Sequence, residues 1–137
     1  MARAVTLAKG LLMAKVYREI TRSVSSSLAK LRADSPELLR GFRTLAEAAT
    51  RDGVLTRKTK ELIALALGVA GHCDACLGFH LQTLIRLGAT RAEVEEALGV
   101  AVYMGGGPSL MYAADALSAF EELSTTEAAS RSIAASS

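Results

Sequence analysis

The two cysteines and two histidines of this chain all lie in one short stretch, from His72 to His80. Cys73 and Cys76 have CxxC spacing, and His80 lies one helical turn beyond Cys76. Cysteine and histidine are the side chains most readily tuned to react near neutral pH. A single CxxC pair does not make a structural disulfide framework, and in a reducing compartment it is more often catalytic or metal-binding. We therefore predict a redox-active dithiol with its own acid–base partner.

The residues around the pair predict that it lies at the start of a helix. Gly71 is expected to end the preceding helix as a left-handed cap, so that the next helix begins within 72–75 with Cys73 or Asp74 as its N-cap. Unpaired backbone N–H groups and the helix dipole favour negative charge there, which lowers the pKa of a thiol and raises its thiolate fraction. Cys76, in the first turn, gains most from this effect, and Cys73 is close enough to form a disulfide with it.

Two further residues complete the predicted site. His80 can act as a base toward the Cys76 thiol or, when protonated, stabilise its thiolate. Glu61 is the last charge before residues 62–70, which are apolar or glycine and predict a helix buried on every side. We expect Glu61 to lie at the border of the core and to orient the imidazole as the third member of a proton relay. The catalytic candidates are thus Cys76, Cys73, His80 and Glu61, with His72 as an auxiliary candidate.

Each candidate also has a structural interpretation. His80 is compatible with a hydrogen-bonded core histidine, His72 with a capping or exposed one, and Glu61 with a surface glutamate. Zinc is the main chemical alternative, because Cys73, Cys76 and His80 supply three ligands and His72 or Glu61 a fourth. Structural zinc usually adds a second CxxC or a paired histidine module, which this sequence lacks. We therefore expect no metal and no cofactor.

Length and composition predict a single all-α domain. The chain has 137 residues, of which 50% are hydrophobic and 22% charged, as is typical of one globular unit. Helix-forming residues dominate, and the runs of Val, Ile and aromatic residues that favour strands are missing. We expect a bundle of about six helices. We expect the chain to divide into a basic N-terminal helical arm (1–33), a core (34–123) and a frayed tail (124–137).

Apolar periodicity predicts where the helices lie and which faces they bury. Besides the CxxC helix, we expect helices within 3–32, from Pro36, from the N-cap Thr56, from a capping box at Thr90 and over 108–123. The predicted inner faces are Leu38, Leu39, Phe42, Leu45, Ala46 and Ala49 in the second helix, and Leu110, Met111, Ala114, Leu117 and Phe120 in the last. Met104 is also expected in the core, and 105–107 in a tight interhelical turn. The first helix is longer than a small domain can cover, so its surplus is expected to pack on another subunit.

Charge and hydropathy limit the partners. The formal net charge of +2 is too small to indicate nucleic acid. Residues 1–32 hold seven basic side chains and one acidic. The arm is therefore expected to steer an acidic partner or a membrane surface, or to be simply a solvated helix face. No apolar run approaches the ~20 residues of a membrane span, so we expect no membrane partner and a cytoplasmic location.

The combined pattern resembles a known signature. Glu61, then eleven residues, then Cys73-x-x-Cys76-x-x-x-His80 is similar to the motif of the alkyl hydroperoxidase D-like branch of the carboxymuconolactone decarboxylase superfamily. The resemblance extends from about Leu38 to Leu123 and includes the break at 87–90 and Gly106-x-Pro108 before the last helix. The first 32 residues and the tail lie outside it.

The resemblance implies an all-α fold and an obligate oligomer, a homotrimer or homohexamer with active sites near subunit contacts. It also implies a thiol-dependent peroxidase that acts on hydroperoxides. Cys76 would be the peroxidatic thiol, Cys73 the resolving thiol, and His80 with Glu61 the proton relay. The implied reductant is a thiol donor such as a lipoyl-bearing protein.

One position departs from the family pattern. Characterised members often carry a histidine directly before the second cysteine, where this chain has Ala75, and His72 precedes the pair instead. The efficiency of the proton relay and the identity of the reductant therefore do not carry over from the characterised members to this chain. The decarboxylase branch lacks the redox pair, which argues against lactone decarboxylation. The alternatives that remain are a disulfide reductase or redox sensor with little peroxidase activity and a structural zinc protein.

Overall fold

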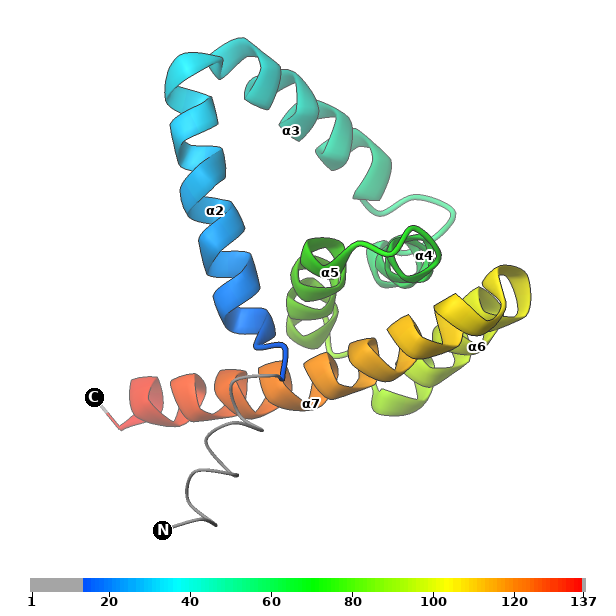
Figure 1. The fold of residues 1–137 in the computed structure, drawn as a ribbon. Helices are drawn as coiled ribbons and strands as arrows, with labels where there is room; N and C mark the ends of the chain where they lie inside the picture. The colour runs from blue at the N-terminus through cyan, green and yellow to red at the C-terminus, as the bar shows by residue number, and fades with distance from the viewer. Residues whose placement is uncertain (1–13, 137) are drawn as a thin grey trace, which may run out of the picture.

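The computed structural model describes residues 14–136, and these fold into six α-helices without a strand (Figure 1). The helices are α2 (Tyr17–Asp34), α3 (Pro36–Thr50), α4 (Arg57–Ala70), α5 (Asp74–Arg86), α6 (Arg91–Gly105) and α7 (Gly107–Ala135). The prediction of an all-α fold is confirmed. Residues 14–16 are not helical, so the helix expected over 3–32 begins only at Tyr17, and residues 1–13 lie outside the described part.

The core lies between α4, α5, α6 and α7. α4 packs against α5 and α6, α7 contacts α4, α5 and α6, and α2 packs on α5. In Figure 1, α2 and α3 form a V beside this group, and α7 runs along its lower edge. The side chains with no exposed surface include Leu65, Val69, Leu77, Leu81, Leu84, Val94 and Ala116. α4 and α5 supply most of these, and together with Cys73, the N-cap of α5, they supply the main catalytic candidates, so the site adjoins the core.

Local capping signals position several helix starts as the sequence predicted. The Thr56 hydroxyl accepts a hydrogen bond from the Thr59 N–H at the start of α4. At α6, Thr90 and Glu93 form a full capping box, each side chain bonded to the other's backbone N–H. These side chains satisfy backbone donors that a helix start otherwise leaves unpaired.

The turn between α4 and α5 differs from the prediction in one residue. Gly71 ends α4 with a φ of −84°, and the left-handed residue is His72, with a φ of 54°. The His72 N–H donates to the Val69 carbonyl and the Cys73 N–H to the Gly68 carbonyl. These two bonds form a Schellman motif, in which the residue after the C-cap takes the left-handed conformation. Cys73 therefore both completes the end of α4 and serves as the N-cap of α5.

Several predicted inner faces are exposed in the protomer. On α3, Leu38, Phe42 and Leu45 are exposed, Phe42 by 68%, because α2 and α4 are the only helices within residues 14–136 that α3 contacts. The prediction that α4 is buried on every side is also wrong, since Ile63 and Leu67 are exposed. Periodicity shows that a face is apolar but not whether it packs within the chain or elsewhere.

α7 buries a different face from the one predicted. Ala113, Ala116, Ala119 and Leu123 are buried against the neighbouring helices, whereas Leu110 and Met111 are exposed. Met104, also expected in the core, is 75% exposed. Small alanines let α7 lie close to its neighbours, and Phe120, one of the predicted inner residues, packs partly buried against the core.

The C-terminal tail is helical rather than frayed from Ser124. α7 continues to Ala135, and its first turns beyond Leu123 hold hydroxyl side chains, Thr125 and Thr126, that bond back to the carbonyls of Glu121 and Glu122. The Glu122 carboxylate also accepts hydrogen bonds from the backbone N–H groups of Tyr17 and Arg18. This contact caps α2, whose own N-cap residue provides no side-chain hydrogen bond.

Two glycine substitutions, one on α5 and one on α6, test the packing of α2 on α5. A Cβ added to buried Gly78 would lie 2.5 Å from the Thr21 methyl, and Thr21 cannot simply rotate, because its hydroxyl bonds the Arg18 carbonyl and the Gln82 amide. We expect Gly78→Ala to lower the free energy of unfolding by about 1–3 kcal/mol. Gly99→Ala is the matched control, with nothing within 4 Å on exposed α6, and should raise it by about 0.5–1 kcal/mol. Urea unfolding measures both, and a Gly78→Ala variant as stable as the Gly99→Ala variant would contradict this packing.

Candidate redox site

The site begins with a disulfide between Cys73 and Cys76 at the N-terminus of α5. Cys73 is the N-cap residue, and the Cys76 backbone N–H donates to its sulfur over 3.2 Å. Both cysteines are partly exposed. The pair thus lies where free backbone donors and the positive end of the helix dipole stabilise a thiolate once the bond is reduced.

A buried carboxylate and a histidine form the second part of the site. Nδ1 of His80 lies 2.6 Å from Oε2 of Glu61, which joins α5 to α4. The Glu61 side chain is only 6% exposed, and His80 is 31% exposed. Glu61 is the one buried charged residue among residues 14–136. Since Nδ1 faces the carboxylate, Nε2 is the ring nitrogen available to exchange a proton with a thiol or substrate.

The antiparallel packing of α4 and α5 brings the two parts together. Glu61 meets His80, and further along α4 a Cβ at Gly68 would lie 3.1 Å from the Cys76 Cβ. Glu61 and Gly68 are two helical turns apart and share one face of α4, while Cys76 and His80 share one face of α5. Gly68 lets the α4 backbone pass directly beside Cys76. One helix interface therefore holds the cysteine pair and the Glu61–His80 pair.

His72 lies apart from this interface. It is exposed in its left-handed conformation, and its ring stacks on Tyr112 of α7 at 4.8 Å between centroids. The structure therefore does not bring the auxiliary candidate to Glu61 and His80.

No metal-binding cluster is assembled in the described part of the chain. Within residues 14–136, no group of three or more His, Cys, Asp and Glu side chains could hold a metal ion. The cysteines that a zinc site would use are joined to each other in this state.

A charged cluster beside the disulfide was missed by the sequence reasoning. Lys15 Nζ donates to Asp74 Oδ1 at 2.9 Å and to Asp115 Oδ2 at 2.6 Å, and the Tyr17 hydroxyl lies 3.4 Å from the same Asp74 oxygen. The hydrogen bonds that Lys15 donates to Asp115 and then to Asp74 raise the pKa of Lys15. Burial, followed by the negative charge of Asp115, raises the pKa of Tyr17. Only Asp74, inside the CxxC, could have signalled this cluster. Its partners are far away in sequence and follow no local pattern.

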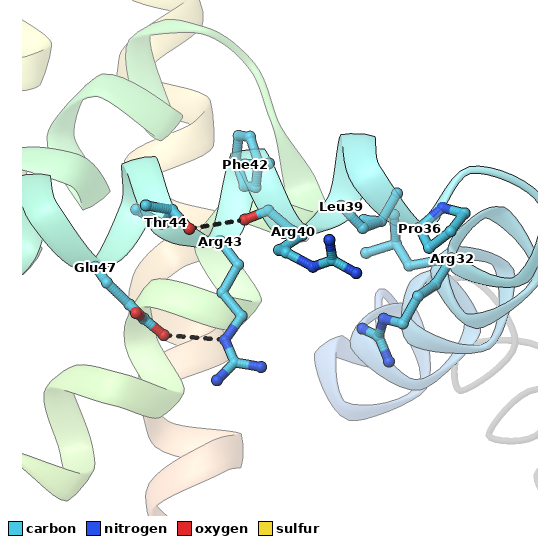
Figure 2. Close-up of a pocket in the computed structure, with 10 residues that line it drawn as sticks. Arg32, Pro36, Leu39, Arg40, Phe42, Arg43, Thr44 and Glu47 are labelled. Atoms are coloured by element: carbon cyan, nitrogen blue, oxygen red, sulfur yellow. Dashed lines mark hydrogen bonds and ion pairs between the residues drawn. The ribbon is translucent and has the colours of Figure 1, made fainter.

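The hollow between α2 and α3 contains none of these residues. It has a volume of about 850 Å³ and is lined by Leu28, Arg32, Pro36, Leu39, Arg40, Phe42, Arg43, Thr44, Ala46 and Glu47. Figure 2 shows Arg32, Arg40 and Arg43 along it, with Arg43 paired to Glu47 at 2.9 Å. The candidate chemistry therefore does not occur in this groove.

None of the helices within residues 14–136 combines the length and apolar character needed to cross a membrane.

Comparisons with known proteins agree with the fold and the signature. Residues 36–119 match the model of the carboxymuconolactone decarboxylase family. An uncharacterized protein from Cupriavidus necator is 44% identical over 88 residues, which span 64% of this chain and 78% of that protein.

Two solved structures of this family are similar to the chain. A carboxymuconolactone decarboxylase family protein from Legionella pneumophila is 62% identical, with a TM-score of 0.78 over 79% of this chain and 96% of that one. A family member from Thermotoga maritima, for which a role in an antioxidative response has been suggested, is 29% identical, with a TM-score of 0.71 over 80% and 94%. The family match covers more than half of the sequence, and the chain therefore belongs to the carboxymuconolactone decarboxylase family.

Proposed function

We propose that this protein is a thiol-dependent peroxidase that reduces hydroperoxides with Cys73 and Cys76. The observation that carries the proposal is the buried Glu61–His80 pair, joined over 2.6 Å, on the same helix interface as the cysteines. A purely structural disulfide needs no such pair, whereas a peroxidatic thiol needs a group that accepts its proton and returns it to the leaving oxygen. The suggested antioxidative role of the Thermotoga maritima relative points the same way.

In the first step, His80 takes the Cys76 proton and the thiolate attacks one peroxide oxygen. The S–O bond forms as the O–O bond breaks. The leaving alkoxide takes the proton from His80 and departs as an alcohol. Cys76 is oxidised by two electrons to a sulfenic acid, and the peroxide is reduced. Glu61 keeps the imidazole oriented and stabilises its protonated form between the two transfers.

In the second step, the Cys73 thiolate attacks the Cys76 sulfur. The S–S bond forms as the S–O bond of Cys76 breaks. The hydroxide that leaves takes up the proton released by the Cys73 thiol and departs as water. The product is the Cys73–Cys76 disulfide present in this structure. A dithiol donor then restores both thiols by exchange and is itself oxidised to a disulfide. A lipoyl-bearing protein is the donor that we propose.

Steady-state turnover tests this function. The reduced protein is mixed with cumene hydroperoxide and dihydrolipoamide, and peroxide loss is followed beside loss of donor thiols. We expect one peroxide consumed for each dihydrolipoamide oxidised, well above the rate without protein. Reversible oxidation of the cysteines with no peroxide loss would instead support a disulfide reductase or redox sensor.

We also propose that the protein assembles as a homotrimer or homohexamer. The exposed Leu38, Phe42 and Leu45 on α3 form the kind of apolar face that an assembly covers. Replacing Phe42 with glutamate should lower the particle mass measured by light scattering, because a charge would be buried without a partner. A wild-type protein that is monomeric at micromolar concentration would contradict the proposal.

A further inference from the structure

Lys15 links three separate parts of the chain next to the redox pair. It precedes α2, and its ammonium bonds Asp74, at the first position of α5, and Asp115 of α7. It also lies over the Tyr112 ring, 4.9 Å from the centroid. Tyr17, two residues later, is buried and reaches the same Asp74 oxygen. The contacts form one network that ends on Asp74, one of the two residues between the cysteines.

The charges in this network affect the thiols directly. Asp74 lies between Cys73 and Cys76, and a carboxylate there disfavours a thiolate by like-charge repulsion. Asp115 is a second carboxylate bonded to the same ammonium. Lys15 offsets part of this charge with a cation hydrogen-bonded to both carboxylates. Without Lys15, both carboxylates would remain beside the redox pair with no cation bonded to either.

We propose that Lys15 is a positioning residue for the redox pair: it holds Asp74 and Asp115 on one ammonium, fixes the start of α5 and keeps the reactive thiol ionised. This inference rests on the proposed role of Cys73 and Cys76 as a reducible pair. It assigns part of the site to the segment before α2, outside the region that the family model matches.

The other ionisable groups around the pair come from every packed element. They are Glu61 on α4, His72 in the turn, His80 on α5, Tyr112 on α7 and Tyr17 on α2. Burial holds the Tyr17 phenol neutral by raising its pKa, so that it adds no charge near neutral pH. Lys15 is thus the cation bonded to Asp74 among the residues that the structure describes.

The experiment measures thiol ionisation without peroxide. The reduced full chain carrying Cys73→Ser, which isolates Cys76, is alkylated with iodoacetamide from pH 5 to pH 9.5. The same measurement is made with Lys15→Met, with Lys15→Arg as the charge-keeping control, and with Lys15→Met combined with Asp74→Asn. The rate at pH 7 and the midpoint of the pH profile report the thiolate fraction.

We expect Lys15→Met to slow alkylation at pH 7 by about three- to tenfold and to move the midpoint to higher pH, the size of effect of one partly screened charge. Lys15→Arg should stay near the parent rate. Adding Asp74→Asn to Lys15→Met should restore most of the rate, because the uncompensated carboxylate within the CxxC is then gone and only Asp115 remains without its cation. A loosened α5 would not be rescued in this way.

Two results would overturn the inference: a parent-like midpoint in Lys15→Met, or no rescue in the double variant. The proposed function fails separately, if the wild-type protein consumes no peroxide while the alkylation shift is present. Peroxide turnover in the wild type with no shift in Lys15→Met would leave the function standing and remove the role of Lys15.

Discussion

We expect peroxide consumption to fall to the background rate when Cys76 is replaced by serine. Serine keeps the size of the side chain and its place in the first turn of α5, but a hydroxyl provides almost no nucleophilic anion near neutral pH. The loss should therefore be complete rather than partial. It is measured as the initial rate of cumene hydroperoxide loss with dihydrolipoamide as donor.

Cys73→Ser is the matched variant because it removes the other sulfur. It should consume about one equivalent of peroxide and then stop, since Cys76 forms a sulfenic acid that has no partner for a disulfide. Dimedone traps that species, and mass spectrometry locates it on Cys76. Full turnover in Cys76→Ser, or a dimedone adduct on Cys73 in that variant, would show that the roles of the two cysteines are reversed.

The second large effect is expected at Glu61. Glu61→Gln keeps the shape of the side chain but removes the charge that faces His80 Nδ1. A neutral amide no longer stabilises the protonated imidazole, so the relay loses efficiency at both proton transfers. We expect the rate of Cys76 oxidation to fall by about 10²-fold or more, the usual range for general acid–base groups.

Rapid-mixing measurement of the first oxidation step, from pH 5.5 to pH 9, tests this expectation. Glu47→Gln is the control, because Glu47 is an exposed carboxylate on α3 paired with Arg43. It should oxidise at the wild-type rate. An oxidation rate in Glu61→Gln equal to that of Glu47→Gln would mean that the Glu61–His80 pair is structural.

The sequence predicted those parts of the fold that local chemistry determines. The capping box at Thr90 and the N-cap role of Thr56 depend on a few neighbouring residues, and the structure confirms them. For α5 the sequence left Cys73 or Asp74 as the N-cap, and the structure shows Cys73. The contact between Glu61 and His80 was expected from the place of a charge at the edge of an apolar run, and it is present. The catalytic roles of these residues stay predictions.

The features that were missed depend on tertiary packing. Periodicity could not show that α7 buries small alanines rather than Leu110 and Met111, because apolar side chains occur on several sides of that helix. The left-handed His72 was missed because glycine is the usual residue in that conformation. Lys15 reaches Asp115 across 100 positions of sequence, a distance at which no spacing rule applies.

The most direct test of the central claim is a single turnover without an added donor. The fully reduced protein is mixed with excess cumene hydroperoxide, and peroxide loss is compared with disulfide formation by mass spectrometry. We predict one peroxide consumed for each Cys73–Cys76 disulfide formed. Disulfide formation should keep pace with peroxide loss, or follow it after a lag if Cys76 sulfenic acid accumulates. Thiols that stay reduced while peroxide is untouched, or peroxide loss that continues unchanged after both thiols are blocked, would contradict it.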